Sequence, residues 1–329
     1  MGRFSGRRVI VGIKKEAARG TAETTGFVGY PFTSLDAGDK TDKKLNESPF
    51  GNIVKNNDEI TTLKRGEGTY ESKMWASLLG HLLTAAFGAS PTTTGPTETT
   101  AYSHAFALAN NNTHSSLSID LNDTILHETF ALSMIDSIKF TWVKDDFTKV
   151  EITTQSKAGA VSTATPTILT TDYEFLPKHL AIKLASNLAG LSGATESDDI
   201  ISISLEIKKN LTVSQTSKSK DQVSDINNTD FEISGSIEKY YGDSTYKGYS
   251  DNDTKMAMQL DFISSVLAGA SSIPYSLQFK LAKVSFKNWK AGYGSSDLST
   301  ETIDFEGLYS LTDAKAIEAT LVNKTASYA

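Results

Sequence analysis

Residues 130–142 read Phe-Ala-Leu-Ser-Met-Ile-Asp-Ser-Ile-Lys-Phe-Thr-Trp. Apolar side chains recur at every second position from Phe130 to Trp142, and Asp136 is the one polar residue among them. Because side chains alternate between the two faces of a β-strand, this pattern predicts a strand with one buried face. Trp142 is therefore predicted to be a core residue.

The end of this run returns in the second half of the chain. Ile138-Lys-Phe-Thr-Trp142 is echoed by Val284-Ser-Phe-Lys-Asn-Trp289. In the same order, Glu59-Ile-Thr-Thr is echoed by Glu232-Ile-Ser-Gly. Two echoes in one order predict that the chain carries one fold twice, a common way to build a ring or an array.

The duplication divides the chain into a first domain, residues 1–171, and a second domain, residues 172–329. Most of both reads as alternating strands between clusters of Asn, Asp, Gly and Ser, so each domain is predicted to be a β-sandwich. Trp289 is the predicted core residue of the second domain. The chain is therefore expected to be mainly β, with two tandem sandwiches, each long enough to bury its own core.

Three segments stand out from this pattern. Apolar residues at helical spacing from Met74 to Phe87, followed by Gly88, predict an amphipathic helix whose apolar stripe, with Trp75, covers one end of a sandwich. The alternating run at residues 201–213 predicts one strand of unusual length. Residues 37–58 show no clear periodicity and predict a long loop, which is typical of a functional or disordered segment.

Composition excludes several classes of protein. The 329 residues carry a net charge of −7 and no cysteine, which rules out disulfides and argues against wrapping of nucleic acid. No run approaches the roughly 20 apolar residues that span a bilayer, so no membrane association is expected. The basic start of the chain is followed by an apolar run too short for a secretory signal peptide.

Motifs of catalysis are missing. His127-Glu128 begins like a zinc-protease motif, but Ala131 stands where the second histidine must lie. The chain contains no nucleophile elbow, phosphate loop or dinucleotide fingerprint, and no run completes a calcium loop. We therefore expect no catalytic residue, no cofactor and no metal, and a protein that is not an enzyme.

Several segments resemble the tail tube proteins of long-tailed bacterial viruses. Gly12-Ile-Lys-Lys-Glu-Ala-Ala-Arg-Gly-Thr-Ala22 is similar to the opening pattern of that family, G-x-K-E-x-x-x-G-T-A. The predicted helix, the run Tyr102 to Asn110 and the end from Ile303 to Asn323 follow in the family's order. The two tryptophan runs resemble the duplicated variety of the family, in which three chains supply the six repeats of a ring.

The resemblance implies a structural virion protein that assembles with itself. Rings of three chains, with approximate sixfold symmetry, would stack into a tail tube that is assembled in the host cytoplasm and delivers DNA. Its implied partners are further copies of itself, the tape measure protein, the tail terminator and the distal tail proteins. DNA would pass through the lumen without specific binding, because an acidic wall raises the free energy of contact with phosphates.

This picture assigns roles to particular side chains. Acids in or beside the long strands are candidates to face the lumen: Glu59, Asp145, Asp146, Glu151, Glu232, Glu238 and Glu301. A solvated outer face is the competing interpretation for each. Candidates for contact with the next ring lie in the long loop: Asp39, Lys40, Lys43, Lys44, Phe50 and Lys55.

Two other functions remain open. An all-β carbohydrate-binding, receptor-binding or virion decoration module would share the strand pattern, but it should show clustered aromatics or a calcium site, and neither is evident. A glycoside hydrolase rests only on the abundance of carboxylates, since nothing in the sequence pairs two of them.

Overall fold

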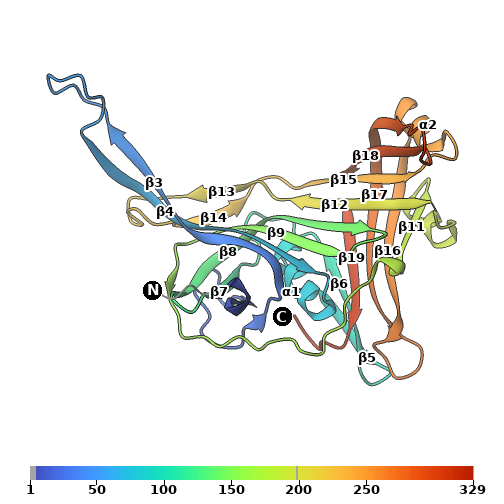
Figure 1. Cartoon of the computed structure of the whole chain (residues 1–329). Helices are drawn as coiled ribbons and strands as arrows, with labels where there is room; N and C mark the ends of the chain where they lie inside the picture. The colour runs from blue at the N-terminus through green and yellow to red at the C-terminus, as the bar shows by residue number, and fades with distance from the viewer. Residues whose placement is uncertain (1–4, 198, 329) are drawn as a thin grey trace.

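The computed structural model describes residues 5–197 and 199–328, and it is built mainly from antiparallel strands (Figure 1). The mainly β prediction is confirmed. Two α-helices interrupt the strands, α1 (Ala76–Phe87) and α2 (Thr245–Asp251). The sequence predicted α1 but not α2, whose seven residues include Gly248 and are too few to show a period.

Eight strands form one long antiparallel sheet that crosses both halves of the chain (Figure 1). In spatial order they are β3 (Phe32–Asn46), β4 (Asp58–Lys73), β9 (Lys149–Ser156), β8 (His127–Val143), β12 (Ile200–Lys208), β15 (Glu232–Tyr240), β18 (Thr300–Leu308) and β17 (Pro274–Gly292).

The same four-strand order occurs twice in this sheet. The first half contributes β3-β4-β9-β8 and the second contributes β12-β15-β18-β17, so each unit places its last strand between its second and third. Each unit also has a helix after its second strand. The repeat seen in the sequence is thus a repeat of topology.

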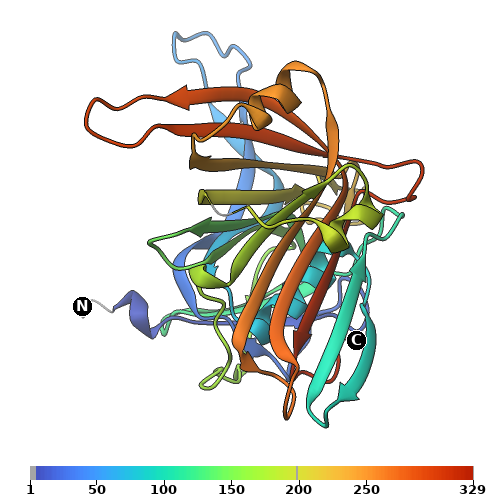
Figure 2. The ribbon, with the colours of Figure 1, turned by 90° about the vertical axis from the view of Figure 1, so that its right-hand side faces the viewer.

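The remaining strands build the walls around the core. The first half of β17 leaves the long sheet and pairs with β16 and β19, so that a second layer stands against the first (Figure 2). This layer contains β11 (Leu180–Ala185), β16 (Lys255–Leu267), β19 (Ile317–Asn323), β6 (Ala101–Ala107) and β5 (Thr92–Thr97). The first half of β8 carries β7 (Leu117–Asn122), β1 (Ile10–Lys15), β2 (Val28–Gly29) and β10 (Ala160–Val161).

The division of the chain at residue 171 stays a prediction. Strands pair across it twice, β8 with β12 and β6 with β19. Apolar residues of both halves also belong to one continuous core. The first-half hairpin of β5 and β6 therefore completes a layer whose other strands come from the second half.

Helix α1 is buried on nearly all sides. Ten of its twelve residues are buried, so the helix fills the space between layers instead of covering one end of a sandwich. Gly88 ends it as predicted, with φ of 85° and its N–H bonded to the Thr84 carbonyl. A side chain here would also strike the His114 ring, so both conformation and space require glycine.

The alternation in the sequence predicted that strand β8 keeps its apolar residues on one face. In the structure it does not. The pairing of β8 with β7 slips between Ser133 and Phe130, and its pairing with β9 slips around Asp136. An extra residue at a β-bulge turns all later side chains to the other face. Leu132 and Met134 therefore leave the main core and form a second apolar cluster.

Two segments differ from their predicted form. Residues 37–58 are not a structureless loop, because β3 and β4 pair as far as Asn46 and Asp58 and extend away from the body as a hairpin (Figure 1). The run 201–213 is not one strand: it ends at Lys208, turns at Asn210 with φ of 46°, and continues as β13 (Leu211–Ser214), which pairs with β14 (Asp225–Asn228).

The three predicted core tryptophans differ in burial. Trp142 belongs to the core and is 8% exposed, and its indole N–H donates to the Pro177 carbonyl. Trp75 and Trp289 are only partly buried and pack against the core from its edge. The extra residue in the second echo is accounted for by a bulge at Asn288, where φ is 56°.

The close approach of strands at Gly235 gives a test of the fold. A methyl group there would lie 2.2 Å from the Ser204 carbonyl oxygen, so Gly235→Ala should lower the free energy of unfolding by about 1–3 kcal/mol. Gly242→Ala is the matched control, because nothing lies within 4 Å of its added carbon. Equal unfolding midpoints in urea for both variants would contradict the arrangement of β12, β15 and β18.

Candidate functional site

One face of the long sheet is entirely polar along continuous rows of paired residues. Residues paired directly across neighbouring strands project from the same face. One row crosses seven strands: Glu71, Glu151, Lys139, Glu206, Ser234, Glu306 and Ser285. The next is Lys73, Lys149, Thr141, Ser204, Ser236, Asp304 and Lys287. Neither row contains an arginine or an aromatic residue.

The opposite face of the same strands is apolar. Between the two polar rows lies the row Ser72, Val150, Phe140, Leu205, Gly235, Phe305 and Phe286. Six of these seven residues are buried. The sheet thus has one face that packs on the core and one that meets solvent, and the change from one half of the chain to the other interrupts neither.

The predicted lumen acids separate into four groups. Glu151, Glu232 and Glu238 lie on the polar face. Asp145 and Asp146 lie in the exposed turn after β8, and Glu59 lies in the extended hairpin, paired with Lys43.

Glu301 is not a surface acid. It is 1% exposed, on the same side of β18 as buried Ile303 and Phe305. It accepts a 2.6 Å hydrogen bond from the Trp289 indole and lies 3.6 Å from the Lys239 ammonium. The prediction that Glu301 faces a lumen is wrong for this structure, because alternation along β18 places the residue on the core face.

Each end of the long sheet leaves a strand edge without a partner among the described residues. Strand β3 pairs only with β4 among the described residues. Strand β17 pairs with β16 as far as Ser285, but residues 286–292 pair only with β18. The equivalent stretch of β8, residues 137–143, pairs with β9 on one side and β12 on the other. Long unpaired edges are sites at which another strand adds.

The tip of the β3–β4 hairpin exposes apolar side chains that the sequence did not single out. Beside Phe50, which is 64% exposed, Leu45, Ile53, Val54 and Ile60 are exposed. The nominated lysines instead pair within the hairpin: Lys40 with Glu67, Lys43 with Glu59, and Lys55 with Glu47. Asp39 accepts a bond from the Gly159 N–H, and Lys44 is exposed. These apolar residues do not alternate, so the only signal for them in the sequence is their presence in a segment that reads as a loop.

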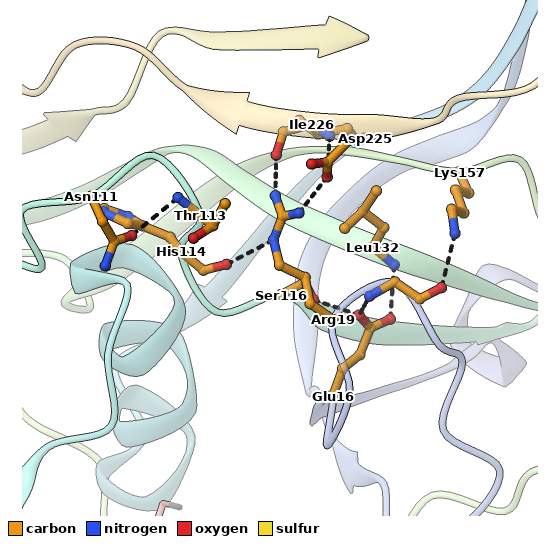
Figure 3. A network of polar contacts seen from close by, with 11 residues as sticks. Glu16, Arg19, Asn111, Thr113, His114, Ser116, Leu132, Lys157, Asp225 and Ile226 are labelled. Atoms are coloured by element: carbon orange, nitrogen blue, oxygen red, sulfur yellow. Dashed lines mark hydrogen bonds and ion pairs between the residues drawn. The ribbon is translucent and has the colours of Figure 1, made fainter. Parts of the chain in front are cut away.

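The motif at residues 12–22 is organised by a buried carboxylate (Figure 3). Glu16 is 5% exposed and accepts hydrogen bonds from the N–H groups of Gly20 (2.5 Å) and Leu132 (2.8 Å) and from the hydroxyls of Ser116 and Ser118. Four donors satisfy a carboxylate that forms no ion pair with the described residues. The Leu132 N–H is free for this bond because the bulge in β8 interrupts the ladder.

The loop held by Glu16 presents Arg19 to the second half of the chain (Figure 3). The Arg19 guanidinium pairs with the Asp225 carboxylate and donates to the carbonyls of Ile226 and, at 3.1 Å, His114. Asp225 and Ile226 begin β14. The motif therefore attaches the hairpin of β13 and β14 to the first half.

Lys209 lies buried where β12 turns into β13. Its ammonium donates to the Ala85 carbonyl at 2.8 Å and lies 3.4 Å from Nδ1 of His114. Burial lowers the pKa of Lys209 to about 7, against the attraction of Asp136. Burial, with Lys209 beside it, lowers the pKa of His114 to about 4. Both groups have a structural role, because they hold α1 against the turn that leads from β12 into the β13–β14 hairpin.

The histidines and acids of the described residues do not gather into a metal centre. No group of three potential metal-ligating residues occurs within residues 5–197 and 199–328. His127 instead bonds to Asp120 at 2.9 Å, and Asp120 also accepts from Thr129 and Ser162. No helix among the described residues is long and apolar enough to cross a bilayer.

Comparison with known proteins identifies a family. A family model described as "Phage tail tube protein" matches residues 6–307, which is nearly the whole chain. These bounds take in the motif at residues 12–22, the extended hairpin and the strands of both four-stranded units as far as Gly307. No curated protein matches the chain.

The buried amine predicts a pH dependence of stability. Folding lowers the pKa of Lys209 from 10.5 to about 7, so between these values the unfolded chain binds a proton that the folded chain does not. The free energy of unfolding should therefore rise with pH across this window. Lys209→Met should flatten the rise in urea unfolding measured from about pH 7 to about pH 10, and Lys208→Met, at an exposed neighbour, should retain it. Parallel profiles for both variants would contradict the role given to burial.

Proposed function

Because the chain belongs to the phage tail tube protein family, we propose that it assembles with itself into closed rings that stack into a tube for DNA delivery. As a member of this family it is a structural component of a phage tail. Ring closure, stacking and the passage of DNA are the finer parts of the proposal, and each is supported by a different surface of the molecule.

The junction of β8 with β12 carries the proposal. It joins the outer strand of the first unit, β8, to the outer strand of the second, β12, through seven antiparallel residue pairs, from Ser137 and Lys208 to Val143 and Ser202. At the two ends of the long sheet, β17 of the second unit and β3 of the first have free edges. Strand β17 runs antiparallel to β3, as β8 does to β12. If the same pairing joined β17 of one chain to β3 of the next, four-stranded units would add to the sheet until it closed into a ring.

Three chains would then supply six four-stranded units. The polar rows would line the lumen and the apolar rows would face outward into the core of each subunit. The row through Glu151 holds four glutamates and one lysine, and the next row holds three lysines and one aspartate. Neither row offers arginine or aromatic contacts to DNA. A wall of short hydroxyls and mixed charge with acids suits a polyanion that passes without binding.

The extended hairpin supports stacking. Its tip holds exposed Phe50, Ile53 and Val54 beyond the body of the subunit, where only another molecule covers them (Figure 1). Internal ion pairs along its sides stiffen it as a projecting arm, although each exposed pair adds little stability. We therefore assign the contact between rings to the apolar tip more than to the lysines.

Assembly of the purified full-length chain tests ring closure. Negative-stain microscopy and sedimentation should show rings of three chains, and tubes at higher concentration, because the two free edges complete each other. A chain that stays monomeric at every concentration, alone and with other tail proteins present, would overturn the proposal.

Shortening the hairpin tests stacking separately from ring closure. Replacing Leu45–Glu59 by Asn-Gly preserves the pairing of Lys44 with Ile60 and closes it with a two-residue turn. Rings should still form and tubes should be lost. The control exchanges Lys43 and Glu59 in the full-length hairpin, which keeps the tip and the ion pair and should leave tubes intact. Tubes of normal length from the shortened chain would show that the hairpin does not join rings.

A further inference from the structure

An apolar groove lies beside the free edge of β3. It has a volume of about 700 Å³ and is open to solvent. Its lining includes Val9 and Val11 from the N-terminal segment, Tyr30, Pro31 and Phe32 at the start of β3, and Ile168. Ile168 is 64% exposed, so the groove leaves apolar surface uncovered in the single chain.

An apolar tip lies beside the free edge of β17. The turn from β17 to β18 spans residues 293–299 and carries Tyr293, 73% exposed, and Leu298, 74% exposed. The hairpin that ends in this turn extends clear of the body, on the side of the molecule opposite the loop between β18 and β19 (Figure 2). Two large apolar side chains at such a tip indicate a contact surface.

The junction within the chain shows where this tip would go in a ring. At that junction, the turn after β8 lies against the start of β12, because the Lys144 N–H donates to the Ile201 carbonyl at 3.0 Å. By their places in the strand order, β17 corresponds to β8 and β3 corresponds to β12, so the turn after β17 would lie toward the N-terminal end of β3. The same junction between two chains therefore brings Tyr293 and Leu298 of one copy to the groove beside Tyr30 and Phe32 of the next.

Charge agrees with this placement. Arg7 lines the groove and Arg8 follows it, and neither guanidinium has an ion-pair partner within the described residues. The tip carries one acid, Asp297, between Tyr293 and Leu298. An apolar tip with a carboxylate fits an apolar groove with a guanidinium at its rim.

We propose that the groove formed by the N-terminal segment, the start of β3 and Ile168 binds the β17–β18 tip of a second copy of this chain. This contact rests on the proposed ring and adds to it a side-chain interface outside the strand pairing. This contact makes the pairing between chains specific. A bare strand edge accepts any strand, whereas the groove accepts only the tip that accompanies β17.

Cross-linking of single-cysteine variants tests the contact, because the chain has no cysteine of its own. Leu298→Cys is mixed with a size-tagged Ile168→Cys and treated with a short bismaleimide, and a heterodimer is expected. A second pair, Lys290→Cys with tagged Ser34→Cys, reports on the strand edges themselves. Edge heterodimers without tip-to-groove heterodimers would overturn this inference and leave the ring in place. Loss of both heterodimers would overturn the strand junction and the inference together.

Assembly gives a second measurement. Tyr293→Ser combined with Leu298→Ser should raise the concentration needed for ring formation roughly tenfold or more, because two apolar side chains lose a buried environment. Leu311→Ser, at a residue 90% exposed on the opposite side, is the control and should assemble normally. All three substituted side chains are exposed in the single chain, so its urea unfolding should not change. Equal assembly of the two variants would contradict the contact.

Discussion

The antiparallel pairing of β8 with β12 is the constraint on which the rest of this structure depends. It joins two four-stranded units of the same order into one sheet and keeps their polar and apolar faces in line. A slip of one residue at this junction would turn the apolar row of the second half toward solvent and its Ser and Glu side chains toward the core. Burial of both halves in one core therefore specifies the register.

Strand β8 also determines how the second hairpin is held. Its bulge at Asp136 interrupts the ladder, and the Asp136 carbonyl and carboxylate accept bonds from the N–H groups of Lys209 and Leu211. The chain turns there, and β13 and β14 cover Leu132 and Met134. The turn is secured by Lys209 against α1 and, further along, by Arg19 against Asp225. Asp136, the one polar residue in an apolar run, thus positions the β13–β14 hairpin.

The two units are alike in topology and unlike in detail. The β3–β4 hairpin of the first unit extends freely. The β13–β14 hairpin of the second unit lies on the first half of the chain, with Val223 and Ile226 buried. Helix α1 has twelve residues and is buried, and α2 has seven. A ring of three such chains would have true threefold and only approximate sixfold symmetry, with three long arms free to reach a neighbouring ring.

The sequence by itself determined the class of structure, the helix with its glycine end, and the family, because these depend on local periodicity and on short motifs. It also predicted a repeat, whose counterpart in the structure is the four-strand order that occurs twice. It also indicated that Trp142 is a core residue. Only the tertiary structure decided which face each side chain occupies. The bulges at Ser133, Asp136 and Asn288 each add one unpaired residue, so the side chains that follow turn to the other face, and composition does not reveal this. Glu301 is a buried partner of Trp289 because it lies on the same side of β18 as Ile303 and Phe305, whereas Glu151 lies on the polar face. The pairing of β8 with β12, and with it the free edges of β3 and β17, joins residues far apart in sequence, and no local pattern specifies such a contact.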